Sequence, residues 1–360
     1  MKAISLFSGM GGDTLGMKQA GIDVVAYSEK EVVFQETHEA NFPNSKLIGP
    51  QVKSDILKIP DEDFAVYKNE IDFLFAGFPC QSFSTGGKRK VNDPRNTMFR
   101  EFVRATRLIK PKVIIGENVK GLLTKKTEDG ALYIDVIVNE FRKLGYEVDF
   151  KIMAAHKYGV PQKRERLIII GIHKDHLGNG FNLSFPEETS ADNPPGINDI
   201  IEFSMEGTKM INNTDIDFSK IPMECLIQDL KNNDSPCGKP HPYLELKLNP
   251  PTRSYQGKDY TTLFSFAKRD SPIHCEVIDV RKPSKTIICT YDHAPRLFVP
   301  IRNKKGNYLR MMLPSELKQI QGFPADYIVK GNDKKQIVQI GNAVPPPMIK
   351  LVVERILGKV

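Results

Sequence analysis

The chain's 360 residues are 40% hydrophobic and 26% charged, which is typical of one or two globular domains and unlike disordered or fibrous proteins. No apolar stretch approaches a membrane span, and the basic start leads straight into a short strand, so we expect no signal peptide or membrane anchor. The net charge of +7 suits a polyanionic partner, although such a charge is often only a means of solubility. Five scattered cysteines without a CxxC pair indicate a reducing compartment and argue against a zinc site or a disulfide framework.

The first half of the chain alternates short apolar runs with helical patterns. We expect strands over residues 3–7, 23–27, 71–76, 113–115, 148–154 and 167–172. We expect helices over residues 14–20, 32–41, 97–109 and 131–144. This order predicts an α/β fold with a doubly wound, mostly parallel sheet.

The composition changes after about Lys174. Residues 178–300 are rich in Pro, Asn, Asp and Gly and have few helical periods, which predicts a smaller, irregular, β-leaning domain with long loops. Regular structure returns with expected helices over residues 314–321 and 344–357.

Two polar motifs follow neighbouring predicted strands. Cys80 comes after the strand 71–76, where Pro79 stiffens the backbone, and Glu117 comes after the strand 113–115. Because open α/β sheets carry their chemistry at the strand ends, a thiol and a carboxylate there could face one substrate from two sides. A single cysteine is otherwise most often a small core residue.

A glycine-rich turn, residues 7–12, lies between the first strand and the first helix, which is the context of a nucleotide-type cofactor loop. Its GxGG spacing departs from the dinucleotide-binding fingerprint. Glu29 follows the second strand, where an acid can bind ribose hydroxyls, and Asp55 could bind an adenine amino group. The alternative is a tight turn with two surface acids.

In motif order, the chain resembles the cytosine-C5 DNA methyltransferases over nearly its whole length apart from the middle region. The segments that carry the resemblance are Phe7–Gly12, Pro79–Gln81, Glu117–Val119, Gln162–Arg166, Arg281–Ile287, Gln321–Pro324 and Gly341–Pro346. Each segment alone is weak evidence, and together in the right order they are specific. One departure is Lys318, near a position where the family often has arginine, so one structural ion pair is expected to differ.

The resemblance implies S-adenosylmethionine as the cofactor. The residues that would bind it are Phe7, Gly9, Gly11, Gly12, Glu29, Asp55, Pro79, Asn342 and Val344. Asn342 could equally be only a cap before the last helix. We expect no metal.

The resemblance also implies roles for the catalytic residues. The Cys80 thiolate would add to cytosine C6, and Glu117 would stabilise the charge that develops at N3. Arg166 would contact the cytosine carbonyl oxygen, and Arg164 would help to fix the active site and the phosphate backbone. Asn118 is expected to order the end of its strand.

A cytosine inside a duplex is out of reach of this machinery, so the resemblance implies that the base is flipped into the site. The loop over residues 82–96 is expected to close over it. Residues expected to contact DNA are Gln81, Ser82, Ser84, Lys88, Arg89 and Arg95. The alternative for the basic run at residues 88–90 is an ordinary solvated loop.

The expected architecture is a catalytic domain of residues 1–174 plus 325–360, with the S-adenosylmethionine-dependent methyltransferase fold, and a target-recognition domain with its hinge at residues 175–324. We expect a monomer that acts on double-stranded DNA, with a cognate restriction endonuclease as a partner at the same site. Such an enzyme would be cytoplasmic in a microbe, or nuclear in a eukaryote. The alternatives are a tRNA cytosine-C5 methyltransferase and a non-catalytic DNA-binding relative, against which the intact catalytic set argues.

Overall fold

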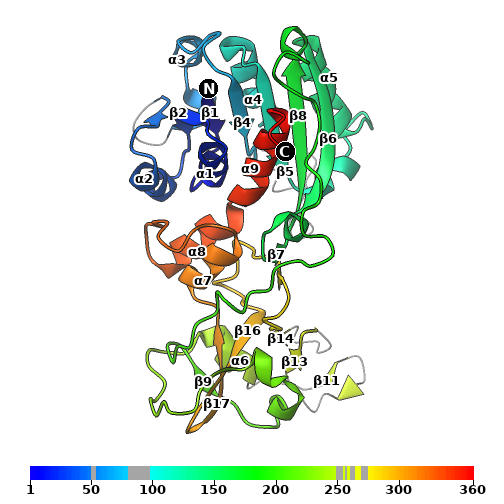
Figure 1. The fold of residues 1–360 in the computed structure, drawn as a ribbon. Coiled ribbons are helices and arrows are strands. Elements are labelled where there is room, and N and C mark those ends of the chain that lie inside the picture. The colour runs from blue at the N-terminus through cyan, green and yellow to red at the C-terminus, as the bar shows by residue number, and fades with distance from the viewer. Residues whose placement is uncertain (50–53, 80–97, 249–253, 256–257, 260–263, 269–274) are drawn as a thin grey trace.

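Two sheets organise the molecule, one in each half of the view in Figure 1, with α7 and α8 between them. The structure is a computed structural model. It describes residues 1–49, 54–79, 98–248, 254–255, 258–259, 264–268 and 275–360.

In these described ranges, the larger sheet has seven strands in the order β3-β2-β1-β4-β5-β8-β6. Strands β1 to β5 pair in parallel, whereas β8 is antiparallel to both β5 and β6. The bounds are β1 Lys2–Leu6, β2 Asp23–Ser28, β3 Lys46–Leu47, β4 Phe73–Ala76, β5 Val113–Asn118, β6 Tyr146–Ala154 and β8 Glu165–His173. The predicted α/β class with a mostly parallel sheet is confirmed.

Helices cover both faces of this sheet, which explains why its central strands are almost wholly apolar. On β4, Phe73 and Phe75 belong to the hydrophobic cluster on the side of α1 and α9, whereas Leu74 and Ala76 belong to the cluster on the side of α4 and α5. The helices of this half are α1 Gly12–Gln19, α2 Val32–Asn41, α3 Asp61–Ala65, α4 Phe99–Ile109, α5 Tyr133–Lys143 and α9 Pro346–Ile356.

The C-terminal helix α9 packs closely against α1, at the start of the chain. A Cβ atom on Gly12 would lie 2.3 Å from the carbonyl oxygen of Val344, and one on Gly16 would lie 2.5 Å from that of Pro346. Any side chain at either glycine would therefore push the two elements apart. The C-terminal segment thus completes the layer that covers the large sheet, as Figure 1 shows.

Within the part of the chain that the structure describes, the smaller sheet has six strands with mixed pairing, in agreement with the expected β-leaning second half. Its path is β13-β14-β16-β17-β9, and β10 also pairs with β16. The bounds are β9 Lys209–Met210, β10 Ile227–Asp229, β13 Phe264–Phe266, β14 Cys275–Val277, β16 Leu297–Asn303 and β17 Gly306–Met311, with helix α6 Pro242–Leu248 beside them. Of the described residues, two further strand pairs lie apart from both sheets: β7 Gln162–Lys163 with β15 Ser284–Lys285, and β11 Ser254–Tyr255 with β12 Lys258–Asp259.

Helices α7 (Pro314–Ile320) and α8 (Asp333–Asn342) join the two halves. Ile320 and Ile340 share one hydrophobic cluster with the smaller sheet and with Met10 and Phe42 of the larger half. The core is therefore continuous across the junction, and the domain bounds remain a prediction. Among the described residues, no helix is long and apolar enough to cross a membrane.

Candidate active site

The ends of β4 and β5 are tied together by Asn118, a buried residue that is 2% exposed. Its side-chain amide donates to the carbonyl oxygen of Phe78 at 3.1 Å, and its Oδ1 accepts from the backbone amide of Val119 at 2.8 Å. The chain just before Cys80 is thus held beside the end of β5. This agrees with the expectation that Asn118 orders the strand end.

Glu117 and Arg166 form an ion pair at this edge of the sheet, with Oε1 and Nε 2.7 Å apart. Each side chain is 14% exposed, so the pair is largely shielded from water but still reachable. Burial lowers the pKa of Arg166 from its usual value, while the neighbouring Glu117 carboxylate opposes that shift. A Cβ atom on Gly77 would lie 3.8 Å from both Glu117 Oε2 and the carbonyl oxygen of Phe7, so the acid lies close to the glycine turn.

Arg164 is buried, with 1% of its surface exposed, and it donates to two backbone carbonyls. Its two terminal nitrogens each lie 3.1 Å from an acceptor, Ile287 O for one and Gly341 O for the other. Burial, with the nearby Arg166 charge, lowers its pKa well below the usual value. Of the two predicted arginines, Arg164 thus fixes the backbone around the site, whereas Arg166 contacts the predicted acid.

The glycine turn has the positive backbone angles that its sequence predicts, with φ of 57° at Gly9 and 86° at Gly11. Glu29 is brought to it, because Oε2 accepts from the Gly9 amide at 2.9 Å and Oε1 accepts from the Glu31 amide at 2.9 Å. Burial raises the pKa of the Glu29 carboxyl. Phe7, Gly9 and Glu29 therefore form one group at the ends of β1 and β2.

The other predicted cofactor residues occupy different settings. Gly12 and Val344 pack against each other, as described above, and Pro79 is partly buried. Asn342 is the exposed last residue of α8, so it does not cap the last helix. Asp55 caps the 3₁₀ helix Ile56–Lys58, accepting from the Leu57 amide at 3.2 Å.

Several predicted residues lie outside the described part of the chain. These are Cys80, Gln81, Ser82, Ser84, Lys88, Arg89 and Arg95. Their roles remain predictions.

Sequence reasoning missed a buried acid beneath the glycine turn. Asp13 is 2% exposed, and its carboxylate accepts a hydrogen bond from the Ser5 hydroxyl. Burial raises the pKa of Asp13 to about 7. An acid inside the first turn of a helix reads in sequence as an ordinary helix-start residue, so nothing marked it as buried.

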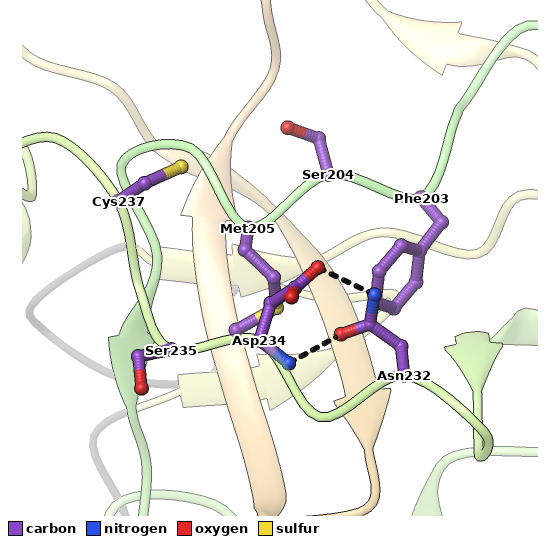
Figure 2. A pocket seen from close by; sticks show the side chains of 7 residues that line it. All are labelled: Phe203, Ser204, Met205, Asn232, Asp234, Ser235 and Cys237. Atoms are coloured by element: carbon purple, nitrogen blue, oxygen red, sulfur yellow. Dashed lines mark hydrogen bonds between the residues drawn. The ribbon is translucent and has the colours of Figure 1, made fainter.

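Two cavities among the described residues lie away from the Glu117–Arg166 ion pair. One, of about 470 Å³, is in the smaller half, where Figure 2 shows Asn232 and Asp234 joined by hydrogen bonds beside Met205. The other, of about 350 Å³, is lined in part by Lys18, Phe42 and Tyr327.

The family of C-5 cytosine-specific DNA methylases matches residues 1–358 of the chain. The type II methyltransferase M.BsuFI of Bacillus subtilis is 32% identical over 353 residues, covering 97% of this chain and 70% of the relative. The type II methyltransferase M.FnuDI of Fusobacterium nucleatum is 30% identical over 374 residues, covering 99% and 94%.

Solved structures share the fold. A protein described as a DNA modification methyltransferase encoded within a prophage (E. coli) superposes with a TM-score of 0.67 at 23% identity, covering 99% of each chain. The S. pombe Dnmt2 methyltransferase gives 0.63 at 16% identity, covering 99% of this chain and 98% of that one. From its family match and its relatives, the chain belongs to the C-5 cytosine-specific DNA methylases and is a DNA (cytosine-5-)-methyltransferase that resembles type II enzymes.

Proposed function

We propose that this enzyme transfers a methyl group from S-adenosylmethionine to C5 of a cytosine flipped out of a short, specific DNA sequence, through a covalent bond between Cys80 and C6. The observation that carries the proposal is the junction of β4 and β5. There Asn118 holds the backbone of Phe78, two residues before Cys80, beside the Glu117–Arg166 pair.

The chemistry requires these residue types. Cytosine C5 is a poor nucleophile, and addition of the Cys80 thiolate at C6 moves electron density toward C5. Glu117 stabilises the charge at N3, and Arg166 binds the carbonyl oxygen. S-adenosylmethionine, when bound, would supply an activated methyl group: C5 would form its bond to the methyl carbon as the carbon–sulfur bond of the sulfonium breaks, and S-adenosylhomocysteine would leave. Loss of the C5 proton to a base or water then breaks the Cys80–C6 bond, returns the electron pair to sulfur and restores the aromatic ring.

The geometry of the glycine turn fits the cofactor. A Cβ atom on Gly9 would have no heavy atom nearer than Phe34, at 4.0 Å, so this side of the turn is open to a ligand, and Phe7 is partly exposed. Gly11, at a positive φ, instead lets the turn pack closely against the protein beneath it. The Glu29 carboxylate is fixed by two backbone amides, so its remaining lone pairs are oriented to accept from ribose hydroxyls. Further cofactor contacts are proposed from Asp55, Pro79, Asn342 and Val344.

The DNA is proposed to lie against residues 175–324, which would read the sequence, while residues 1–174 and 325–360 perform the chemistry. The proposed DNA contacts are Gln81, Ser82, Ser84, Lys88, Arg89 and Arg95. Phosphate contacts of this kind make binding fall steeply with salt. We propose that the enzyme acts as a monomer, with a restriction endonuclease that cuts the same sequence as its cognate partner.

The test incubates the purified protein with radiolabelled S-adenosylmethionine and, in parallel, unmethylated genomic DNA and bulk tRNA. Bisulfite sequencing then maps the methylated positions. We expect label in a short recurring DNA motif, abolished by Cys80→Ser. Label in tRNA alone would contradict the DNA substrate, and tight DNA binding without any transfer would contradict the catalytic role.

A further inference from the structure

The segment between α7 and α8, residues 321–332, crosses from the smaller half of the molecule to the glycine turn. In Figure 1 these helices lie just beyond α1 and α2. The segment also lies alongside α2, because the Asn41 side chain forms two hydrogen bonds with the Ile328 backbone, at 2.8 and 3.0 Å. The Lys330 amide donates to Thr37 Oγ1 at 2.9 Å. Its position is thus fixed against the cofactor-binding half.

Tyr327 reaches from this segment to the glycine turn. Its hydroxyl donates to the carbonyl oxygen of Met10, in the middle of the turn, and its side chain is buried, with the residue 5% exposed. Its ring packs against Phe42, with centroids 6.1 Å apart, and against Phe323, at 4.7 Å. A Cβ atom on Gly11 would lie 3.1 Å from the Tyr327 hydroxyl oxygen, so the turn fits directly over the phenol.

Lys318 of α7 holds Tyr327 from the other side. Its ammonium donates to the carbonyl oxygens of Ala325 and Tyr327, each at 2.7 Å. The residue is buried, and burial lowers its pKa. An ion pair was expected to differ at this position. In the structure, Lys318 is hydrogen-bonded to the backbone carbonyls of Ala325 and Tyr327.

We propose that Tyr327 is a positioning residue, which fixes the glycine turn in its cofactor-binding shape through Met10 and is itself held by Lys318. The inference rests on the proposed binding of S-adenosylmethionine at this turn. Without the Tyr327 hydroxyl, the buried Met10 carbonyl loses this hydrogen bond, and the glycine turn populates other conformations. Cofactor binding must then return the turn to its binding conformation, which weakens the apparent affinity. Once the cofactor is bound, the turn is ordered again, so the chemical step is unaffected.

The test is Tyr327→Phe, which removes only the hydroxyl. We expect KM for S-adenosylmethionine to rise about tenfold, with kcat and the Kd for DNA unchanged. The matched control is Tyr146→Phe, because Tyr146 is also buried and its hydroxyl donates to a backbone carbonyl, Pro111 O, at 2.5 Å. The control should lose similar thermal stability and keep its KM.

Lys318 supplies a second, independent pair of variants. Lys318→Met should also raise KM for S-adenosylmethionine. Lys318→Arg keeps hydrogen-bond donors for the carbonyl oxygens of Ala325 and Tyr327, so its KM should stay at the wild-type value. A KM for Tyr327→Phe equal to that of Tyr146→Phe, or a loss confined to kcat, would overturn the inference.

Calorimetric titration of S-adenosylmethionine into the free protein separates this inference from the proposed function. Wild-type protein that binds no cofactor would refute the proposed cofactor site. Wild-type protein and Tyr327→Phe that bind it equally well would refute the positioning role alone.

Discussion

Asn118→Ala tests the link between β4 and β5. The substitution removes two hydrogen bonds, one to the Phe78 carbonyl at 3.1 Å and one from the Val119 amide at 2.8 Å. Two hydrogen bonds and the unpaired backbone groups left behind amount to about 2–4 kcal/mol of stability. The chain entering Cys80 then loses its anchor, and a shift of about 1 Å at a reacting group lowers kcat roughly 100-fold.

The assay measures kcat at saturating DNA and cofactor, together with urea unfolding. Asn303→Ala is the matched control, since Asn303 is also buried, with 3% exposed, and lies in the smaller sheet. Its amide donates to Asp234 O at 3.0 Å and its Oδ1 accepts from the Lys305 amide at 2.8 Å. We expect both variants to lose stability and only Asn118→Ala to lose kcat. Equal kcat in the two variants would refute the reasoning.

Three further substitutions test the Glu117–Arg166 ion pair, the buried acid Asp13 and the buried ion pair between Arg310 of β17 and Glu316 of α7. Arg166→Lys keeps the charge but loses the planar fork facing Glu117, so kcat in the methyl-transfer assay should fall about 100-fold; unchanged kcat would contradict this role. Asp13 has a pKa raised to about 7 in the fold and near 4 when unfolded, so its stabilising contribution is complete below pH 4 and is lost as the pH rises through 7. Asp13→Asn should remove this pH dependence of the free energy of unfolding, measured by urea unfolding at pH 5 and 8. The same pH dependence in the variant and in the wild-type protein would contradict the prediction. Arg310 Nη2 lies 2.6 Å from Glu316 Oε1 in a buried ion pair, so Arg310→Met leaves the buried Glu316 carboxylate without its cation. The substitution should lower the free energy of unfolding by about 3–5 kcal/mol.

The control for the last substitution is Lys143→Met, which breaks an exposed pair with Glu140. It should change the free energy of unfolding by less than about 1 kcal/mol. Similar decreases in the free energy of unfolding of both variants would show that burial does not make the Arg310–Glu316 pair more important for stability than an exposed pair.

The sequence predicted the fold well wherever one apolar run or one helical period defined an element. The helix expected over residues 32–41 is α2 to the residue. β5 continues three residues beyond its expected end at Ile115, because Glu117 and Asn118 pair with β8. That pairing is antiparallel and comes from a strand 50 residues later, so a local pattern could not reveal it.

Other features depended on contacts between distant segments. Helix α8 was not expected, because its sequence is largely polar and its stability comes from the Asn332 cap and from packing of Ile337 and Ile340. The close packing of Gly12, where an added Cβ atom would lie 2.3 Å from the Val344 carbonyl oxygen, joins segments more than 300 residues apart, and its expected cofactor contact remains a prediction. The residue types of the site were readable from sequence, whereas the partners that hold Arg164 and Tyr327 were not.

The contacts of Arg164 and Gly12 have a consequence for biosynthesis. The parallel core strands all precede residue 119, but one of the two backbone acceptors of Arg164 is Gly341 O, and α1 packs closely against α9. A nascent chain that has not yet reached Gly341 contains all the proposed catalytic side chains but lacks these supports of the site. We therefore expect a stop codon placed before Gly341 to leave no partly active enzyme, and modification of DNA to begin only after the segment through α9 has been synthesised.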